Sequence, residues 1–176
     1  RNLQAVAQAQ GASTVSGYLL LTEASPDRAF DQLAAQAGGV IDGGWRVERT
    51  AEPCALRLHQ GDSFPLFVVA GRQIVTAEDL EVLALCTGQY MADGAPLSAV
   101  LHTVEQWGGL AALPWGFGKW MGQRGRTIEQ TLSQLDPSHQ FLGDNSGRPT
   151  FWQKTPHFQQ AQQLGLRILP GTDPLP

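Results

Sequence analysis

The second half of the chain repeats one order of elements three times: an amphipathic helix, a short apolar strand, and a polar loop rich in Gly or Pro. We expect the first helix over the apolar positions 97–104, the second from an N-cap at Thr127, and the third after Thr155. The strands that follow them are expected at residues 110–113, 140–142 and 166–169. Such alternation favours a mostly parallel sheet, either open or closed into a barrel, with ligands beyond the carboxyl ends of the strands.

The first half of the chain combines one similar unit with a different pattern. An apolar strand at 18–21 precedes a helix that opens at Ser25-Pro26, whereas between 44 and 86 apolar and polar residues alternate, as in antiparallel strands. We therefore expect one α/β domain over residues 1–176 with an antiparallel meander in its front half. A helix is expected over 2–10, and because the chain starts inside it and stops after a strand, we expect further sequence at both ends.

Charge and cysteine content limit the classes of partner. The formal net charge is −4 and the pI about 5.5, so there is no basic field to hold a nucleic-acid backbone. No apolar run approaches the roughly 18 residues of a membrane span. Cys54 and Cys86 are too few for a disulfide framework, which favours reduced thiols and a cytoplasmic protein.

Several stretches of the chain are similar to strands of one known family: residues 17–23, 69–74 with 81–83, 108–115, and 168–173. Their apolar framework and their order resemble the PHP family, named for polymerase and histidinol phosphatase. The resemblance implies a distorted seven-stranded (β/α) barrel with metal ligands at the strand ends. It also implies that this chain is incomplete, because the family's opening His-x-His strand would precede Arg1.

The family's metal ligands are largely replaced in this chain. Gln73, Leu83 and Trp115 stand where the family has Glu or His, and they do not supply the deprotonated donors that a divalent site needs. Only Glu23 and Asp173 keep a carboxylate. The resemblance therefore implies a degenerate centre, with Glu23 and Asp173 as the remaining candidate ligands for Zn²⁺, Mn²⁺ or Mg²⁺.

The loop region 115–126 gathers cations beside aromatic rings in an otherwise acidic protein. Trp115, Lys119 and Arg124 are candidate groups for a phosphate or carboxylate on an organic body. The alternative is an aromatic lid whose cations are solvated. The loop 144–149 either adds Asp144 and Arg148 to the same site or forms a turn whose Asp and Asn bond their own backbone.

Three functions follow from these observations. The first is the binding of a small anionic molecule by a degenerate PHP-like domain, through Trp115, Lys119, Arg124, Asp144, Arg148 and Asp173. The second is a metal-dependent hydrolase of the phosphoesterase type, whose remaining ligands lie outside this sequence. The third is a protein-interaction domain in which Trp115 and Trp120 form an exposed apolar patch.

Overall fold

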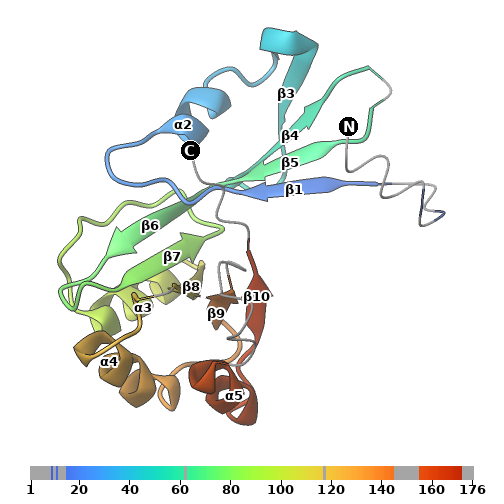
Figure 1. The fold of residues 1–176 in the computed structure, drawn as a ribbon. Helices are drawn as coiled ribbons and strands as arrows, with labels where there is room; N and C mark the ends of the chain where they lie inside the picture. The colour runs from blue at the N-terminus through green and yellow to red at the C-terminus, as the bar shows by residue number, and fades with distance from the viewer. Residues whose placement is uncertain are drawn as a thin grey trace.

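The computed structural model describes residues 9, 11, 15–61, 63–116, 118–144 and 155–171. They form two mixed five-stranded sheets with short helices (Figure 1). Sheet A has the strand order β1-β5-β4-β3-β2, and sheet B the order β10-β9-β8-β7-β6. The two sheets are therefore made from the N-terminal and the C-terminal parts of the described chain, respectively.

Sheet A is a meander with one parallel strand added at its edge. Its strands are β1 (Gly17–Leu20), β2 (Val40–Ile41), β3 (Trp45–Arg49), β4 (Ala55–His59) and β5 (Leu66–Val69). Strands β2 to β5 pair antiparallel, and β1 pairs parallel with β5. Helix α2 (Ala29–Ala34) covers one face, and the 3-10 helix η1 (Asp42–Gly44) joins β2 to β3. Alternation along β3, β4 and β5 places the buried residues of this core on that face: Phe30, Val47, Leu56, Leu58, Val68 and Ala70.

Sheet B changes from antiparallel to parallel pairing along the chain. Its strands are β6 (Gly71–Val75), β7 (Glu81–Leu85), β8 (Leu110–Trp115), β9 (Gln140–Asp144) and β10 (Ile168–Pro170). The β6/β7 and β7/β8 pairs are antiparallel, and β8, β9 and β10 are parallel. The connections to the last three strands contain α3 (Leu97–Gln106), α4 (Gln123–Leu132) and α5 (Pro156–Gln163). These helices pack on one face of the sheet and bury the larger core (Figure 1).

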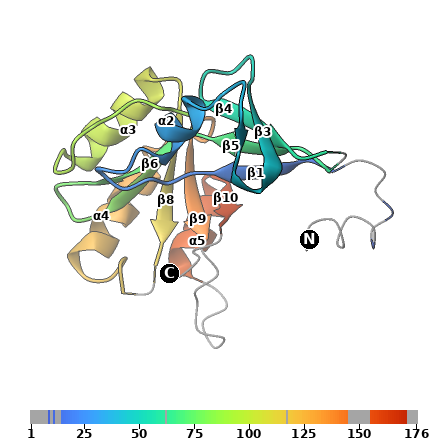
Figure 2. The same cartoon turned by 90° about the horizontal axis from the view of Figure 1, so that it is seen from above.

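The two sheets meet where β5 runs into β6 through Ala70. The segment after β1 also crosses this junction, because Glu23 forms a parallel bridge with Arg72, so that segment lies beside β5 and β6 in turn (Figure 2). At the crossing Gly71 is buried, and a Cβ added there would approach the backbone oxygens of Leu21 and Ala84. The close approach of three chain segments therefore requires glycine at this position.

The expected (β/α) barrel is wrong, because the described residues form two mixed sheets and no closed barrel. Strands β6 and β7 are joined by the tight turn 76–80 rather than by a crossover helix, so β7 runs antiparallel to its neighbours. The sheets end at β1 and at β10, which do not pair with each other in the described residues. The antiparallel meander and the helix–strand order from residue 97 onward are confirmed.

Two helix starts differ from the expected ones. Helix α4 begins at Gln123 rather than after Thr127, whose Oγ1 donates back to the Gln123 carbonyl from within the helix. Helix α2 begins at Ala29, and its N-terminal amide at Phe30 is capped by the distant carboxylate of Glu23. The expected helix 2–10, apart from residue 9, lies outside the described residues. Among those described, no helix has the length and apolarity needed to cross a membrane.

Candidate functional site

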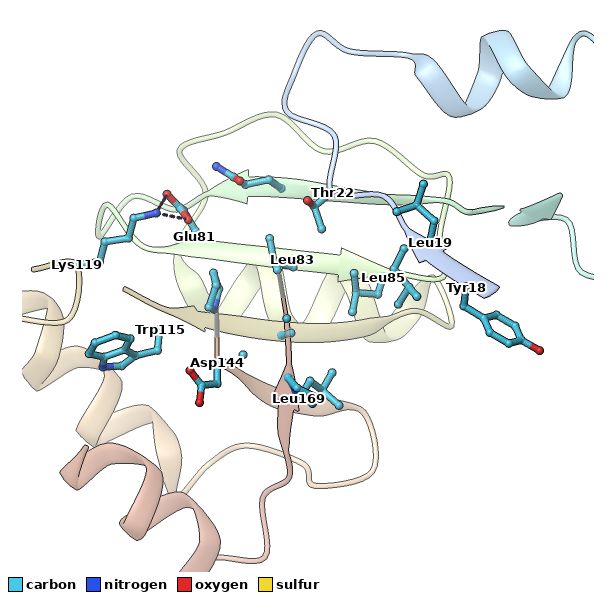
Figure 3. A pocket seen from close by; sticks show the side chains of 17 residues that line it. Tyr18, Leu19, Thr22, Glu81, Leu83, Leu85, Trp115, Lys119, Asp144 and Leu169 are labelled. Carbon is cyan, nitrogen blue, oxygen red and sulfur yellow. Dashed lines mark hydrogen bonds and ion pairs between the residues drawn. The ribbon is translucent and has the colours of Figure 1, made fainter. Parts of the chain in front are cut away.

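A pocket of about 480 Å³ lies between β1 and the face of sheet B that the helices leave uncovered (Figure 3). Strand alternation determines what lines it. Along β7 the side chains of Glu81, Leu83 and Leu85 face the pocket, while those between them enter the helix-covered core. Further lining comes from β1, β8, the end of β9 and β10. We call this the large pocket.

The large pocket is apolar over most of its length and polar at one end. Tyr18 and Leu19 of β1 and Leu169 of β10 line the apolar part with Leu83 and Leu85 (Figure 3). Gln73, Thr22 and Asp144 contribute polar groups, and Glu81 and Lys119 close the polar end. A ligand that fits this lining has an apolar body and one polar end.

The polar end is organised by an ion pair between Glu81 and Lys119. The Lys119 ammonium donates to Glu81 Oε1 at 2.7 Å and to Oε2 at 2.8 Å. The Lys119 amide donates to the Gly116 carbonyl at 3.0 Å, which brings the lysine back over the end of β8. A Cβ added at Gly116 would lie 2.7 Å from Lys119 Cδ, so a larger residue there would displace the lysine side chain.

A second, smaller cavity of about 120 Å³ lies on the other side of this ion pair. Glu81, Pro114 and Lys119 line both spaces, so the two adjoin at these residues. Arg124 of α4 and Asp79 of the β6–β7 turn also line the small cavity, and their Nη1 and Oδ2 atoms lie 2.8 Å apart. Arg124 Nη2 donates to the Gly118 carbonyl, so the guanidinium is held at this position from two sides.

The structure brings several of the predicted ligand-binding residues together. Trp115, Lys119 and Asp144 line the large pocket, and Lys119 and Arg124 line the small cavity. Arg148 and Asp173 lie outside the described residues.

The two tryptophans of this region are core residues. The side chains of Trp115 and Trp120 are only 3% and 6% exposed, and they pack against Phe158 and His157 of α5. The exposed apolar patch expected for an interaction domain is therefore not formed by these two residues.

Glu23 lies at the junction of the sheets and does not line the large pocket. Its Oε1 accepts the Phe30 amide at 2.7 Å, and its Oε2 lies 3.9 Å from Arg72 Nη1. The other positions that the family resemblance marks as ligands, Gln73, Leu83 and Trp115, do line the pocket, but they bring an amide, an alkyl group and an indole. This donor set does not fit a divalent metal centre.

The described residues contain one other group with metal-ligand chemistry. Glu105 of α3 lies near Asp136 and His139 of the loop before β9, and one donor atom of each falls within 4.8 Å of the others. Asp136 already accepts hydrogen bonds from the Ser138 amide at 2.9 Å and from His139 Nδ1 at 3.1 Å. These bonds lower the pKa of Asp136, with the Ser138 amide making the larger contribution. Glu105 and His139 of this cluster are exposed, and none of its three residues lines the large pocket.

Sequence reasoning missed most of the apolar lining and both acidic partners. Tyr18 and Leu19 belong to the expected apolar strand 18–21, and they are 66% and 49% exposed at the edge of sheet A. Glu81 had a recognisable signal, since it opens the alternation with Leu83 and Leu85 on one face of a strand. For Asp79 the sequence carries no such signal beyond its place in a turn.

No family model, curated protein or solved structure matches this chain. Its function is therefore argued from the geometry of the site alone.

Proposed function

We propose that this protein binds a small organic molecule with an apolar body and an anionic end group, and that the large pocket is its binding site. The observation that carries the proposal is the polarity gradient of the pocket, from Tyr18, Leu85 and Leu169 to the ion pair of Glu81 and Lys119. Ligand sites of proteins have volumes of about 300–1,000 Å³ and combine an apolar lining with a few placed polar groups. The pocket has both properties.

The large pocket also has rigid walls on its sheet B side. Leu85 and Ala112 are buried on this face with Phe141, and the same strands are anchored from behind by the helix-covered core. The walls are therefore ordered before a ligand arrives, which reduces the entropic cost of binding. A cytoplasmic location is part of the proposal. It rests on the small number of cysteines, two, which favours reduced thiols over a disulfide framework.

The binding of a neutral apolar probe tests the pocket itself. N-phenyl-1-naphthylamine becomes fluorescent in an apolar environment, and we expect saturable binding to the full chain. Leu83→Trp places an indole inside the pocket, and we expect at least tenfold weaker binding, because the added ring occupies the volume that the probe needs.

Leu164→Trp is the matched control, since Leu164 is exposed at the end of α5 and does not line the large pocket. Circular dichroism checks that both variants are folded. Equal binding by wild type and both variants refutes the assignment of the site.

A further inference from the structure

The small cavity combines two cations with two carboxylates. Lys119 and Arg124 both line it, and they are held by Glu81 and Asp79, which are two residues apart at the start of β7. The four formal charges cancel, so the cavity is neutral as it stands. A space of about 120 Å³ holds several water molecules or one tetrahedral oxyanion.

The two ion pairs differ in how strongly they are held. Glu81 is largely shielded and accepts two short hydrogen bonds from Lys119. Asp79 contributes a single oxygen, and its side chain is 79% exposed, which leaves it free to turn into solvent. Exposed ion pairs contribute little to stability, so replacing Asp79 at Arg124 with another anion costs little.

Both cations also keep donors that their present partners do not use. An ammonium has three N–H donors, and in the described residues two of those of Lys119 are directed at Glu81. A guanidinium has five, and Arg124 uses one toward Asp79 and one toward the Gly118 carbonyl. An oxyanion between them therefore gains charge-assisted hydrogen bonds from both side chains without separating Glu81 from Lys119.

We infer that the small cavity is an oxyanion subsite, bridged by Lys119 and Arg124, in which Asp79 stands in for the anionic group of the ligand. The inference deepens the proposed function and rests on it, since Glu81, Pro114 and Lys119 line both spaces and the subsite therefore adjoins the polar end of the large pocket. The ligand class is an organic phosphate monoester, because its phosphoryl group offers more than two acceptor oxygens and can accept hydrogen bonds from Lys119 and Arg124 at the same time. A carboxylate of the same shape binds more weakly.

Isothermal titration with phenyl phosphate, benzoate and phenol tests this inference on the full chain. We expect phenyl phosphate to bind at least tenfold more tightly than phenol, with benzoate between them. Arg124→Gln removes one cation, and we expect the advantage of phenyl phosphate over phenol to fall about tenfold, while phenol binding stays unchanged.

Asp79→Asn should strengthen the binding of phenyl phosphate. A gain in affinity cannot be explained by loss of folding, so this variant complements Arg124→Gln. Asn tolerates the left-handed backbone of this residue, φ 57°, and it removes the competing charge. We expect phenyl phosphate to bind this variant several-fold more tightly than wild type. Arg126→Gln is the control, since Arg126 lies on α4 and bonds Gln123 rather than lining the cavity.

The outcomes separate the two proposals. If phenol binds but phenyl phosphate binds no more tightly, or if Asp79→Asn gives no gain, the oxyanion subsite is refuted and the large pocket stands. If inorganic phosphate binds equally to wild type, Arg124→Gln and Arg126→Gln, the subsite is also refuted. If neither phenol nor the apolar naphthylamine probe binds, the proposed function itself is wrong.

Discussion

Replacing Glu23 by Gln is expected to destabilise the protein strongly, because Glu23 and Arg72 form a buried ion pair at the junction of the sheets. Both side chains are 7% exposed, and the closest charged atoms are 3.9 Å apart. The amide of Gln keeps the shape of the side chain and an oxygen for the Phe30 amide, so the substitution removes the charge alone. Arg72 then stays buried without a counter-charge, and its Nε already has no hydrogen-bond partner in the described residues.

The expected loss of unfolding free energy is about 3 kcal/mol. Breaking a buried pair from one side costs about 3–5 kcal/mol. We take the lower end of this range, because the charged atoms of Glu23 and Arg72 are far apart for an ion pair and because Arg72 also donates a hydrogen bond to the Asp27 carbonyl. With an m-value of about 2 kcal/mol/M, the urea midpoint falls by about 1.5 M. Glu23→Ala also removes the cap of α2 and loses about 1 kcal/mol more.

Urea unfolding followed by circular dichroism measures these differences. Glu52→Gln is the control, since Glu52 is exposed and forms no ion pair in the described residues. The double variant Glu23→Gln with Arg72→Met removes both charges, and we expect it to recover part of the loss. A midpoint shift for Glu23→Gln no larger than that of the control refutes the role assigned to the pair.

Three further predictions use other parts of the molecule. Gly71→Ala should lower the melting temperature by several degrees, because an added Cβ has no room at the sheet junction, whereas Gly88→Ala, which meets no atom within 4 Å, should be nearly neutral. Asp136→Asn should reduce the stability of the protein at neutral pH but not in strong acid. The pKa of Asp136 is lowered in the folded protein, so its carboxylate stabilises the fold at a pH above the unfolded pKa, and this stabilisation is lost as the pH falls through the folded pKa. The Cys86 thiol should react with Ellman's reagent more slowly than an unfolded cysteine, because burial, with a smaller electrostatic contribution from the neighbouring Cys54, raises the pKa of Cys86. Equal rates before and after unfolding would contradict this.

The elements of the second half could be predicted because their signals are local. The apolar spacing of Leu97, Val100 and Val104 identifies α3, and Thr155-Pro156 marks the start of α5. Sheet topology depends instead on which distant strands pair. The alternation in β6 and β7 is equally compatible with a barrel strand and with a hairpin, and only the short turn between them decides for the hairpin.

The candidate site could be predicted only for residues that follow a strand. Lys119 and Trp115 end or follow β8, so their place at a sheet edge is readable from the chain order. The ion pairs of this site cannot be read from the chain order, since Glu81 is 38 residues away from Lys119 and Asp79 is 45 residues away from Arg124. The expectation of free cations at this edge therefore missed the carboxylates that neutralise them.

The continuous backbone through Ala70 has a consequence for how the molecule can be divided. The two sheets resemble two domains in outline, but the strand 66–75 belongs to both, and the segment after β1 crosses the same line (Figure 2). A cut there leaves each sheet its five strands but breaks the continuous strand, and among the described residues only the contact of the segment around Glu23 with Arg72 then joins the halves along the backbone. We expect each half to remain unfolded when it is produced alone, and a mixture of the two halves to reassemble only weakly. In the intact protein, we expect the most protected amides of both sheets to show one common exchange rate, with the same dependence on denaturant concentration.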